Sequence, residues 1–453
     1  MRQPTSSPIV RLRDANHARD TAVCWEIVTT QASLARTGPR VFLAMPGFRT
    51  LLCSRFAAQW ADGVFRAGFA GALLFNPERG ADALAIAGGF AAMLLPYSLV
   101  GPFAGALLDR WDRRRVLVFA NLARAIAIVA AALAVGFGAS GFGLFALGLV
   151  AEGMSRFIGS GMSASLPHLV PEHAIVSANA VATTLGSLVA VLGGGCAIGL
   201  RELVGHGNSG SAWTTSAAVL GAVVAAAIAA KFAKGALGPS TVDEPPDVVL
   251  AVAKGLADGA RAARTSTNVT GGFVALFAHR ASFGVSLLLS VLLLRFAFTN
   301  LGPLRAGLPG LGQMAALGGA GIFVAGLCTP KLVARFGRRR TTVGSLVVAA
   351  ATQLGLGLPM TLPTVLLATF LIMASGQVLK LSVDSAVQHD IRDEARGRVF
   401  ALYDTLFNIT QVVAVAIAAA ITPFDGRSPS LLIAATVVYL AGAAGYLAIV
   451  RRD

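Results

Sequence analysis

A short arginine-rich segment occurs twice in the chain, once in each half. The first copy is residues 105–115, GALLDRWDRRR, and the second is residues 329–340, TPKLVARFGRRR. Each lies between two long apolar runs, so each is expected to form a tight hairpin at the surface of a membrane. A soluble protein has little reason to repeat an arginine cluster where two apolar segments meet. The repeat therefore predicts a membrane transporter built from two related halves.

The composition excludes an ordinary soluble domain. The chain is 55% hydrophobic and 13% charged, with a mean hydropathy of +0.71, whereas roughly a quarter of the residues in a soluble domain are charged. A helix needs about 20 apolar residues to cross a bilayer. Runs of this kind lie near residues 51–75, 83–108, 116–137, 142–163, 178–200, 213–233, 274–298, 309–329, 342–358, 363–386, 399–422 and 430–450. We therefore expect an all-α membrane protein with twelve transmembrane helices in two six-helix halves.

The runs and the segments between them predict four regions. A cytoplasmic N-terminal tail at 1–47 precedes a six-helix half at 48–233. A cytoplasmic linker at 234–273 leads to the second six-helix half at 274–453. Within the linker, residues 248–264 carry polar side chains at helical spacing beside an apolar face, which indicates an amphipathic helix on the inner leaflet.

The placement of lysine and arginine predicts the orientation. Most of the 37 basic residues fall on one side of the twelve runs, and the positive-inside rule makes that side cytoplasmic, with both termini there. The net charge of +15 then reflects topology and contact with anionic membrane lipids, and nucleic-acid binding is not expected. Residues 1–45 lack the compact apolar core of a cleaved signal peptide. We place the chain in a bacterial inner membrane.

Charged side chains inside the expected spans are candidate functional residues, because each costs about 2.5–3.5 kcal/mol there even on permissive scales. Four polar residues of the first run fall at i, i+4, i+7 and i+11 and so share one helix face: Arg55, Gln59, Asp62 and Arg66. Asp62 lies near the middle of this run, and Glu152, one turn from Arg156, lies near the middle of the fourth. Both carboxylates are candidates for proton coupling. The alternative is that they form structural ion pairs.

Asp404 is the third proton-coupling candidate. No cation lies four residues from it on its own helix, so it must pair across helices, with Arg280 or Arg124, or stay protonated. The alternative is that it serves the start of the eleventh helix. Lys380 and Asp384 are spaced i, i+4 and are expected to form a structural pair.

The first arginine-rich segment resembles the signature loop of the major facilitator superfamily, G-x-x-x-D-R-x-G-R-R. The matching residues are Gly105, Asp109, Arg110, Arg113 and Arg114, and Asp112 stands in place of the second glycine. Together with residues 165–171 (SLPHLVP) and 396–402 (RGRVFAL), the segment is similar to the branch that holds macrolide and siderophore exporters. The resemblance implies the twelve-helix fold and a gating role for the loop, with the acid at Asp109 docking on the start of the eleventh helix. The alternative is a positive cluster that only fixes topology.

The fifth run departs from the antiporters of that superfamily, which often carry G-P-x-x-G-G there. Residues 194–199 read GGCAIG, without the proline. The sequence contains no nucleotide-binding loop and no metal-ligand spacing, so neither a cofactor nor a metal is expected.

The leading hypothesis is a monomeric, proton-coupled exporter of a small amphipathic or hydrophobic compound, and not an enzyme. One alternative is a facilitator or flippase of a lipid or lysolipid. Another is a membrane receptor or scaffold that does not transport.

Overall fold

The computed structural model describes residues 45–78, 83–99, 103, 108, 111–171, 175–238 and 248–450. The tail up to residue 44 and the motif residues Gly105, Asp109 and Arg110 lie outside the described residues. The elements in chain order are α3 (Pro46–Leu74), α4 (Ala83–Leu99), α6 (Arg113–Gly136), α7 (Phe142–Ser165), η1 (Leu166–His168), α8 (Ile175–Val204), α9 (Asn208–Ser216), α10 (Ala218–Ala229), α11 (Val248–Ala263), α12 (Thr267–Leu292), η3 (Leu293–Ala297), α13 (Gly307–Thr352), η4 (Gln353–Gly357), α14 (Leu362–Asp390), α15 (Asp393–Ile421) and α16 (Pro429–Ile449).

Nine of the described helical segments are long and apolar enough to cross a membrane. The expected all-α membrane architecture is therefore confirmed. The polar helix α3 is not among the nine, and the apolar part of α4, Ile86–Pro96, is shorter than the others. The count of twelve transmembrane helices stays a prediction.

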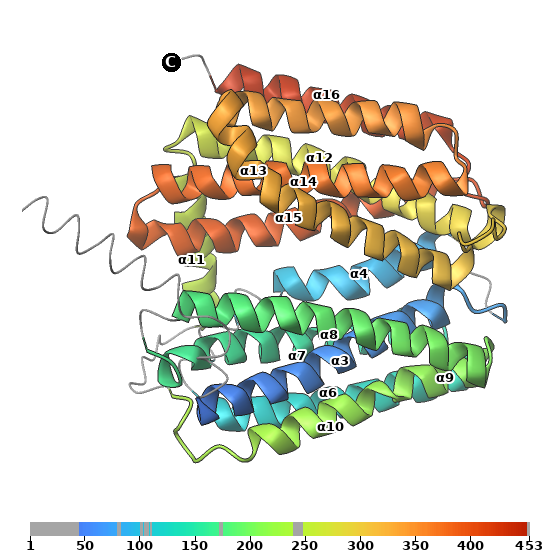
Figure 1. The fold of residues 1–453 in the computed structure, drawn as a ribbon, viewed down its shortest axis with the longest axis vertical. Coiled ribbons are helices and arrows are strands. Elements are labelled where there is room, and N and C mark those ends of the chain that lie inside the picture. Colours follow the sequence, from blue (N-terminus) through green and yellow to red (C-terminus); the bar gives the residue numbers. More distant parts are fainter. Residues whose placement is uncertain are drawn as a thin grey trace, which may run out of the picture.

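The segment 307–357 contains two of the expected spans. As one straight helix its 51 residues would extend about 76 Å, more than twice the roughly 30 Å of a bilayer's hydrocarbon core. The chain bends at Gly337, whose φ of 77° and ψ of 158° are non-helical and are easily adopted only by glycine. Figure 1 shows the two arms of α13 on either side of this bend. The second arginine-rich segment, 329–340, therefore forms a sharp turn between two helices.

The helices form two bundles (Figure 1). The first contains α3 to α10, and the second contains α12 to α16. The bundles meet where α4 packs against α15, and there the Ser98 hydroxyl donates to the Thr405 carbonyl at 2.9 Å. The helices lie side by side, so their termini gather at two ends of the molecule. We call the end where α6 begins the Arg113 end and the end where α12 runs into η3 the Arg295 end; they lie on the left and on the right of Figure 1.

The expected amphipathic helix of the linker is present as α11, at the Arg113 end (Figure 1). It packs against the start of α15, and Asp258 forms an ion pair with Arg398 at 3.0 Å. Gly259 permits this contact, because a Cβ atom there would lie 2.5 Å from the Arg398 carbonyl oxygen. The linker helix is thus tied to the second bundle.

The seventh expected span starts earlier than the apolar run indicated. We expected it near residue 274, whereas α12 begins at Thr267, where the Ser266 hydroxyl caps the helix by accepting from the Val269 amide at 3.2 Å. The polar first turns hid this start from a hydropathy argument. As a result, His279 and Arg280 lie well inside the helix rather than near its start.

Helices α3 and α8 approach each other closely through glycine. A Cβ atom at Gly63 would lie 1.8 Å from the Ala190 carbonyl oxygen, and one at Gly193 would lie 2.3 Å from the Trp60 carbonyl oxygen. Small residues of this kind allow the backbones of membrane helices to touch. Gly195, two residues further along α8, has no neighbour within 4 Å of its Cβ position.

We expect Gly193→Ala to lower the free energy of unfolding by about 1–3 kcal/mol, because the new methyl group forces α8 away from the α3 backbone. Gly195→Ala is the matched control on the same helix, and should be neutral or slightly stabilising. Thermal unfolding of the purified variants in detergent measures both. Equal melting temperatures for the two variants would contradict this account of the α3–α8 contact.

Candidate functional site

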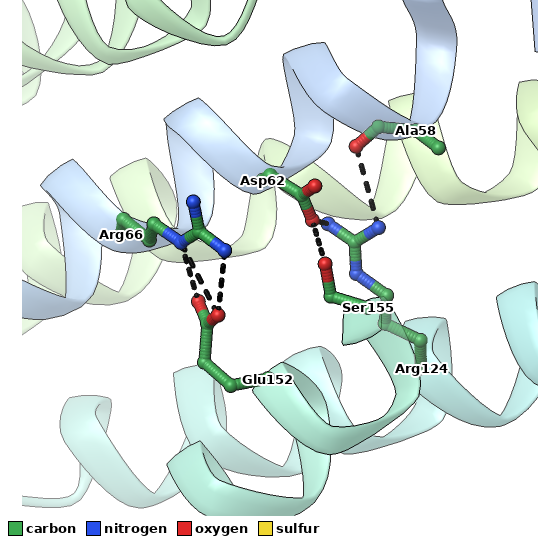
Figure 2. Close-up of polar contacts among 6 residues, drawn as sticks. All are labelled: Ala58, Asp62, Arg66, Arg124, Glu152 and Ser155. Atoms are coloured by element: carbon green, nitrogen blue, oxygen red, sulfur yellow. Dashed lines mark hydrogen bonds and ion pairs between the residues drawn. The ribbon is translucent and has the colours of Figure 1, made fainter. Parts of the chain in front are cut away.

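The polar stripe of α3 faces the interior of the first bundle. Its side chains reach three different helices, with Arg55 contacting α8, Asp62 contacting α6 and α7, and Arg66 contacting α7. Figure 2 shows the part of this stripe that meets α6 and α7. The helical spacing predicted that these polar residues lie on one face of α3, and that face lies at the polar centre of the bundle.

Asp62 is neutralised by Arg124 of α6. Their side chains approach to 2.6 Å, and the Ser155 hydroxyl of α7 donates to the same carboxylate at 2.5 Å (Figure 2). The Arg124 side chain is only 1% exposed, and it also donates to the Ala58 carbonyl at 3.3 Å. Arg124 was considered in the sequence as a partner for Asp404, and that pairing is wrong because Asp62 occupies it.

Glu152 is neutralised by Arg66 rather than by its helical neighbour Arg156. The Nε of Arg66 donates to both carboxylate oxygens, at 3.0 and 3.2 Å, and Nη2 donates to Oε2 at 2.8 Å (Figure 2). A guanidinium that grips a carboxylate through two nitrogens makes a strong, directional contact. The Glu152 side chain is 2% exposed and that of Arg66 is 38% exposed, so this pair borders a solvent-accessible space.

Arg55 and Gln59 complete the stripe toward the Arg113 end. Arg55 is buried and its Nη2 donates to the Thr183 hydroxyl of α8 at 3.2 Å, while Gln59 is half-buried. Both line a cavity of about 10 Å³ that also touches Asp62 and Arg124. This volume is close to that of one water probe. In this conformation this cavity thus has no room for a substrate.

Asp404 lies on an exposed part of α15, beside the contact between the two bundles. Its electrostatic neighbours include Lys380 of α14 and Arg156 of α7, and so come from both bundles. The expected pair of Lys380 and Asp384 is present at 2.7 Å. Arg280 was also expected as a partner for Asp404, and it lies instead inside the second bundle.

Arg280 is stacked on aromatic rings inside the second bundle. Its guanidinium carbon is 3.7 Å from the centre of the Phe407 ring and 5.7 Å from that of Phe283. Among the described residues, no carboxylate lies within ion-pair distance of it. The expectation that it pairs with Asp404 is therefore wrong.

The described part of the signature loop binds helix ends at the Arg113 end. Buried Arg113 donates to the carbonyls of Ala164, at 2.8 Å, and Leu108, at 3.3 Å, and Arg114 donates to the Ala230 carbonyl at 2.9 Å. The Ala164 and Ala230 carbonyls lie at the C-terminal ends of α7 and α10, where helix carbonyls have no helical partner. Asp112, which departs from the family motif, caps α6 by accepting from the Arg114 amide at 3.1 Å. The gating role of Asp109 stays a prediction.

Two arginines that the sequence analysis did not single out bind the end of α3 at the Arg295 end. Arg201 of α8 donates to the Phe75 carbonyl at 3.2 Å, and Arg295 of η3 donates to the carbonyls of Leu74 and, at 3.2 Å, Asn76. Arg295 belongs to the second bundle, so it fastens the bundles together here. A cavity of about 440 Å³ lies beside both arginines. Single arginines at the ends of apolar runs gave no sequence signal of this role.

No group of three or more His, Cys, Asp or Glu within the described ranges is arranged to hold a metal ion.

We expect Asp62→Asn to lower the free energy of unfolding by about 3–5 kcal/mol, because it leaves the buried Arg124 guanidinium without its counter-ion. The double change Asp62→Asn with Arg124→Gln should recover most of this loss. Asp425→Asn is the control, since its carboxylate lies 4.0 Å from Arg427 in an exposed pair that contributes little. Thermal unfolding compares the three, and an Asp62→Asn protein as stable as the parent would refute the pairing.

Both the sequence and the architecture are similar to those of known proteins. Residues 51–415 match the sequence profile described as the Major Facilitator Superfamily. Two uncharacterized MFS-type transporters, from Mycobacterium bovis and Mycobacterium tuberculosis, are each 39% identical over 414 residues, which is 90% of this chain and 92% of the relative.

The crystal structure of the nucleoside transporter NupG superposes with a TM-score of 0.70 at 12% identity, covering 90% of this chain and all of that one. At this identity the likeness concerns the fold alone. The family match and the mycobacterial relatives are the stronger findings, since they cover most of the chain. The chain therefore belongs to the major facilitator superfamily, whose members are membrane transporters and not enzymes.

Proposed function

We propose that the chain is a proton-coupled secondary transporter that exports a small amphipathic or hydrophobic compound across a bacterial inner membrane. The two halves, 48–233 and 274–453, move against each other about the linker at 234–273. The Arg113 end faces the cytoplasm, because the basic residues gather there.

One observation carries the proposal of proton coupling. Asp404 is exposed beside the contact between the bundles, and its cationic neighbours Lys380 and Arg156 lie on different bundles. Separation of the bundles removes Arg156 from Asp404. A carboxylate that loses a cationic neighbour takes up a proton more readily. Proton uptake is thereby linked to the movement that alternating access requires.

Asp62 and Glu152 support this proposal in a different way. Each is held by an arginine, Arg124 or Arg66, within the first bundle, so relative movement of the bundles leaves its partner in place. Of the three candidate acids, Asp404 is the one whose surroundings must change during the cycle. We therefore assign the coupling role to Asp404.

Asp404→Asn should abolish proton-driven transport and leave downhill flux. The chain is reconstituted into liposomes, and movement of fluorescent anilinonaphthalene sulfonate is followed with and without an imposed proton gradient. Asp393→Asn is the matched control, an acid in the first turn of the same helix that pairs at the surface with Arg396 at 2.5 Å, and it should leave coupling intact. Concentrative transport by the Asp404→Asn protein would refute the coupling role. Flux that never responds to protons in the parent chain would favour the facilitator.

Arg295→Gln should open the Arg295 end of the molecule. Leu308 is 6% exposed and packs against Gly71 of the opposite bundle, so a cysteine placed at 308, with the native cysteines replaced by serine, reports on the closure. Loss of the Arg295 contacts should raise its labelling rate by a membrane-impermeant thiol reagent about tenfold, because charge-assisted hydrogen bonds contribute about 1.5–3 kcal/mol. Arg305→Gln, a change at an exposed arginine in the adjoining loop, should leave the rate unchanged. An unchanged rate in Arg295→Gln would show that this arginine does not hold the bundles together.

A further inference from the structure

A cavity of about 190 Å³ lies inside the second bundle, between α12, α13, α14 and η4. Its wall is mainly apolar and includes Leu287, Leu311, Met314, Ile372 and Leu432. For comparison, an apolar cavity of about 150 Å³ takes up benzene. The cavity therefore has room for one ring or a short alkyl segment, and is too small for the two chains of a membrane phospholipid.

The side-chain amide of Gln353, on this wall, can donate a hydrogen bond to a ligand. Gln353 is 1% exposed, and its Oε1 accepts from the Ser286 hydroxyl at 3.0 Å. Among the described residues, its Nε2 has no hydrogen-bond partner. Leaving a buried amide donor unsatisfied costs about 1–3 kcal/mol. An oxygen atom of a bound molecule would remove that cost.

Arg280 lies next to this cavity on the same helix face. Residues 280, 283, 287 and 290 follow the i, i+3, i+7, i+10 spacing of one face of α12, and the last three line the cavity. The Phe283 ring is shared, since it lines the cavity and also lies 5.7 Å below the Arg280 guanidinium. The neighbouring His279 hydrogen bonds to the carbonyl of Ile372, a residue of the cavity wall, at 3.2 Å. The guanidinium and the cavity thus adjoin each other, with the Phe283 ring in contact with both.

Within the described ranges, the surroundings of Arg280 supply hydrogen-bond donors and no carboxylate within ion-pair distance. Its electrostatic neighbours are the tyrosines of α15 and α16, Tyr403 and Tyr439. Both hydroxyls are buried, and in the described part of the chain neither has a hydrogen-bond partner, nor does the Nε of Arg280. The first bundle, by contrast, gives Arg124 and Arg66 a carboxylate each. A cation in a membrane protein interior needs such a partner.

We propose that Arg280 and the adjoining cavity form one binding site for an amphipathic organic anion. The carboxylate or sulfonate of the ligand accepts from Arg280, while its ring or short alkyl segment fills the cavity. This inference rests on the proposed transport function and specifies its substrate as an anion. The stacking of Arg280 on Phe407 holds the guanidinium in place while no anion is bound.

Binding of octanoate to the full chain in phosphatidylcholine nanodiscs tests the site, with 1-octanol as the uncharged probe of the same length. We expect octanoate to bind more tightly than octanol, and Arg280→Gln to weaken octanoate binding about tenfold or more while changing octanol binding less than about twofold. Ala368→Phe, which fills the cavity wall, should weaken both probes. Arg335→Gln is the matched control, because Arg335 also lies over a phenylalanine ring, at 5.5 Å, but is exposed. It should change neither.

The outcomes are separable from those of the transport assay, since binding in nanodiscs needs no gradient and no movement. Arg280→Gln is expected to melt at or above the parent temperature, because it removes an unpaired charge, so weaker binding would not reflect unfolding. Equal affinity of the parent for octanoate and octanol, or unchanged octanoate binding in Arg280→Gln, would overturn the proposal. Loss of octanoate binding on adding phosphatidylglycerol to the discs would assign the site to a lipid and likewise overturn it. Binding without proton-driven flux would refute the coupling and leave the anion site standing.

Discussion

Neutralisation of charge inside the first bundle is the constraint on which the rest of the structure depends. Asp62 and Glu152 are buried inside the first bundle, where an unpaired charge is costly, and each is bound by an arginine on another helix, at 2.6 and 2.8 Å. Both pairs start from α3, so they join α3 to α6 and α7. The glycines at 63 and 193 bring α8 against the same helix. The described part of the bundle is therefore assembled around α3, which carries the polar stripe.

Arginine has a second use at the helix ends. Arg113 binds the Ala164 carbonyl in the last turn of α7 at one end of the molecule, and Arg201 and Arg295 bind carbonyls at and just beyond the end of α3 at the other. The carbonyl end of a helix carries partial negative charge, so a guanidinium is a suitable partner there. Among the described contacts of these three arginines, only those of Arg295 cross from one bundle to the other. The same chemistry thus serves contacts within one bundle in two places and a contact between the bundles in the third.

The buried arginines of the two bundles have different kinds of partners. In the first, Arg124 and Arg66 have carboxylates. In the described part of the second, Arg280 has aromatic rings and partner-free tyrosine hydroxyls instead. An internal ion pair leaves little attraction for a ligand, whereas a cation without an anion retains it. This asymmetry makes the first bundle the better candidate for a rigid body and the second for the body that recognises an anion.

How far the sequence predicts this protein differs between fold and site. Hydropathy and the repeated arginine segment gave the helical membrane architecture and the turn at Gly337, because bilayer thickness limits what an apolar run can form. Helical spacing placed Arg55, Asp62 and Arg66 on one face, and correctly paired Lys380 with Asp384, since neighbours on one helix are set by local geometry. The polar start of α12 was missed, because hydropathy does not detect a cap.

Pairing between helices came only from the tertiary structure. The sequence offered Arg156 as a neighbour for Glu152, and Arg280 or Arg124 as partners for Asp404, yet Glu152 pairs with Arg66 and Asp62 pairs with Arg124. The sequence by itself determined that buried charges exist and which helix face carries them. Which cation meets which acid depends on how the helices are rotated and how deeply each residue lies in the bundle. These quantities are fixed by packing over the whole bundle, and no local pattern in the chain encodes them.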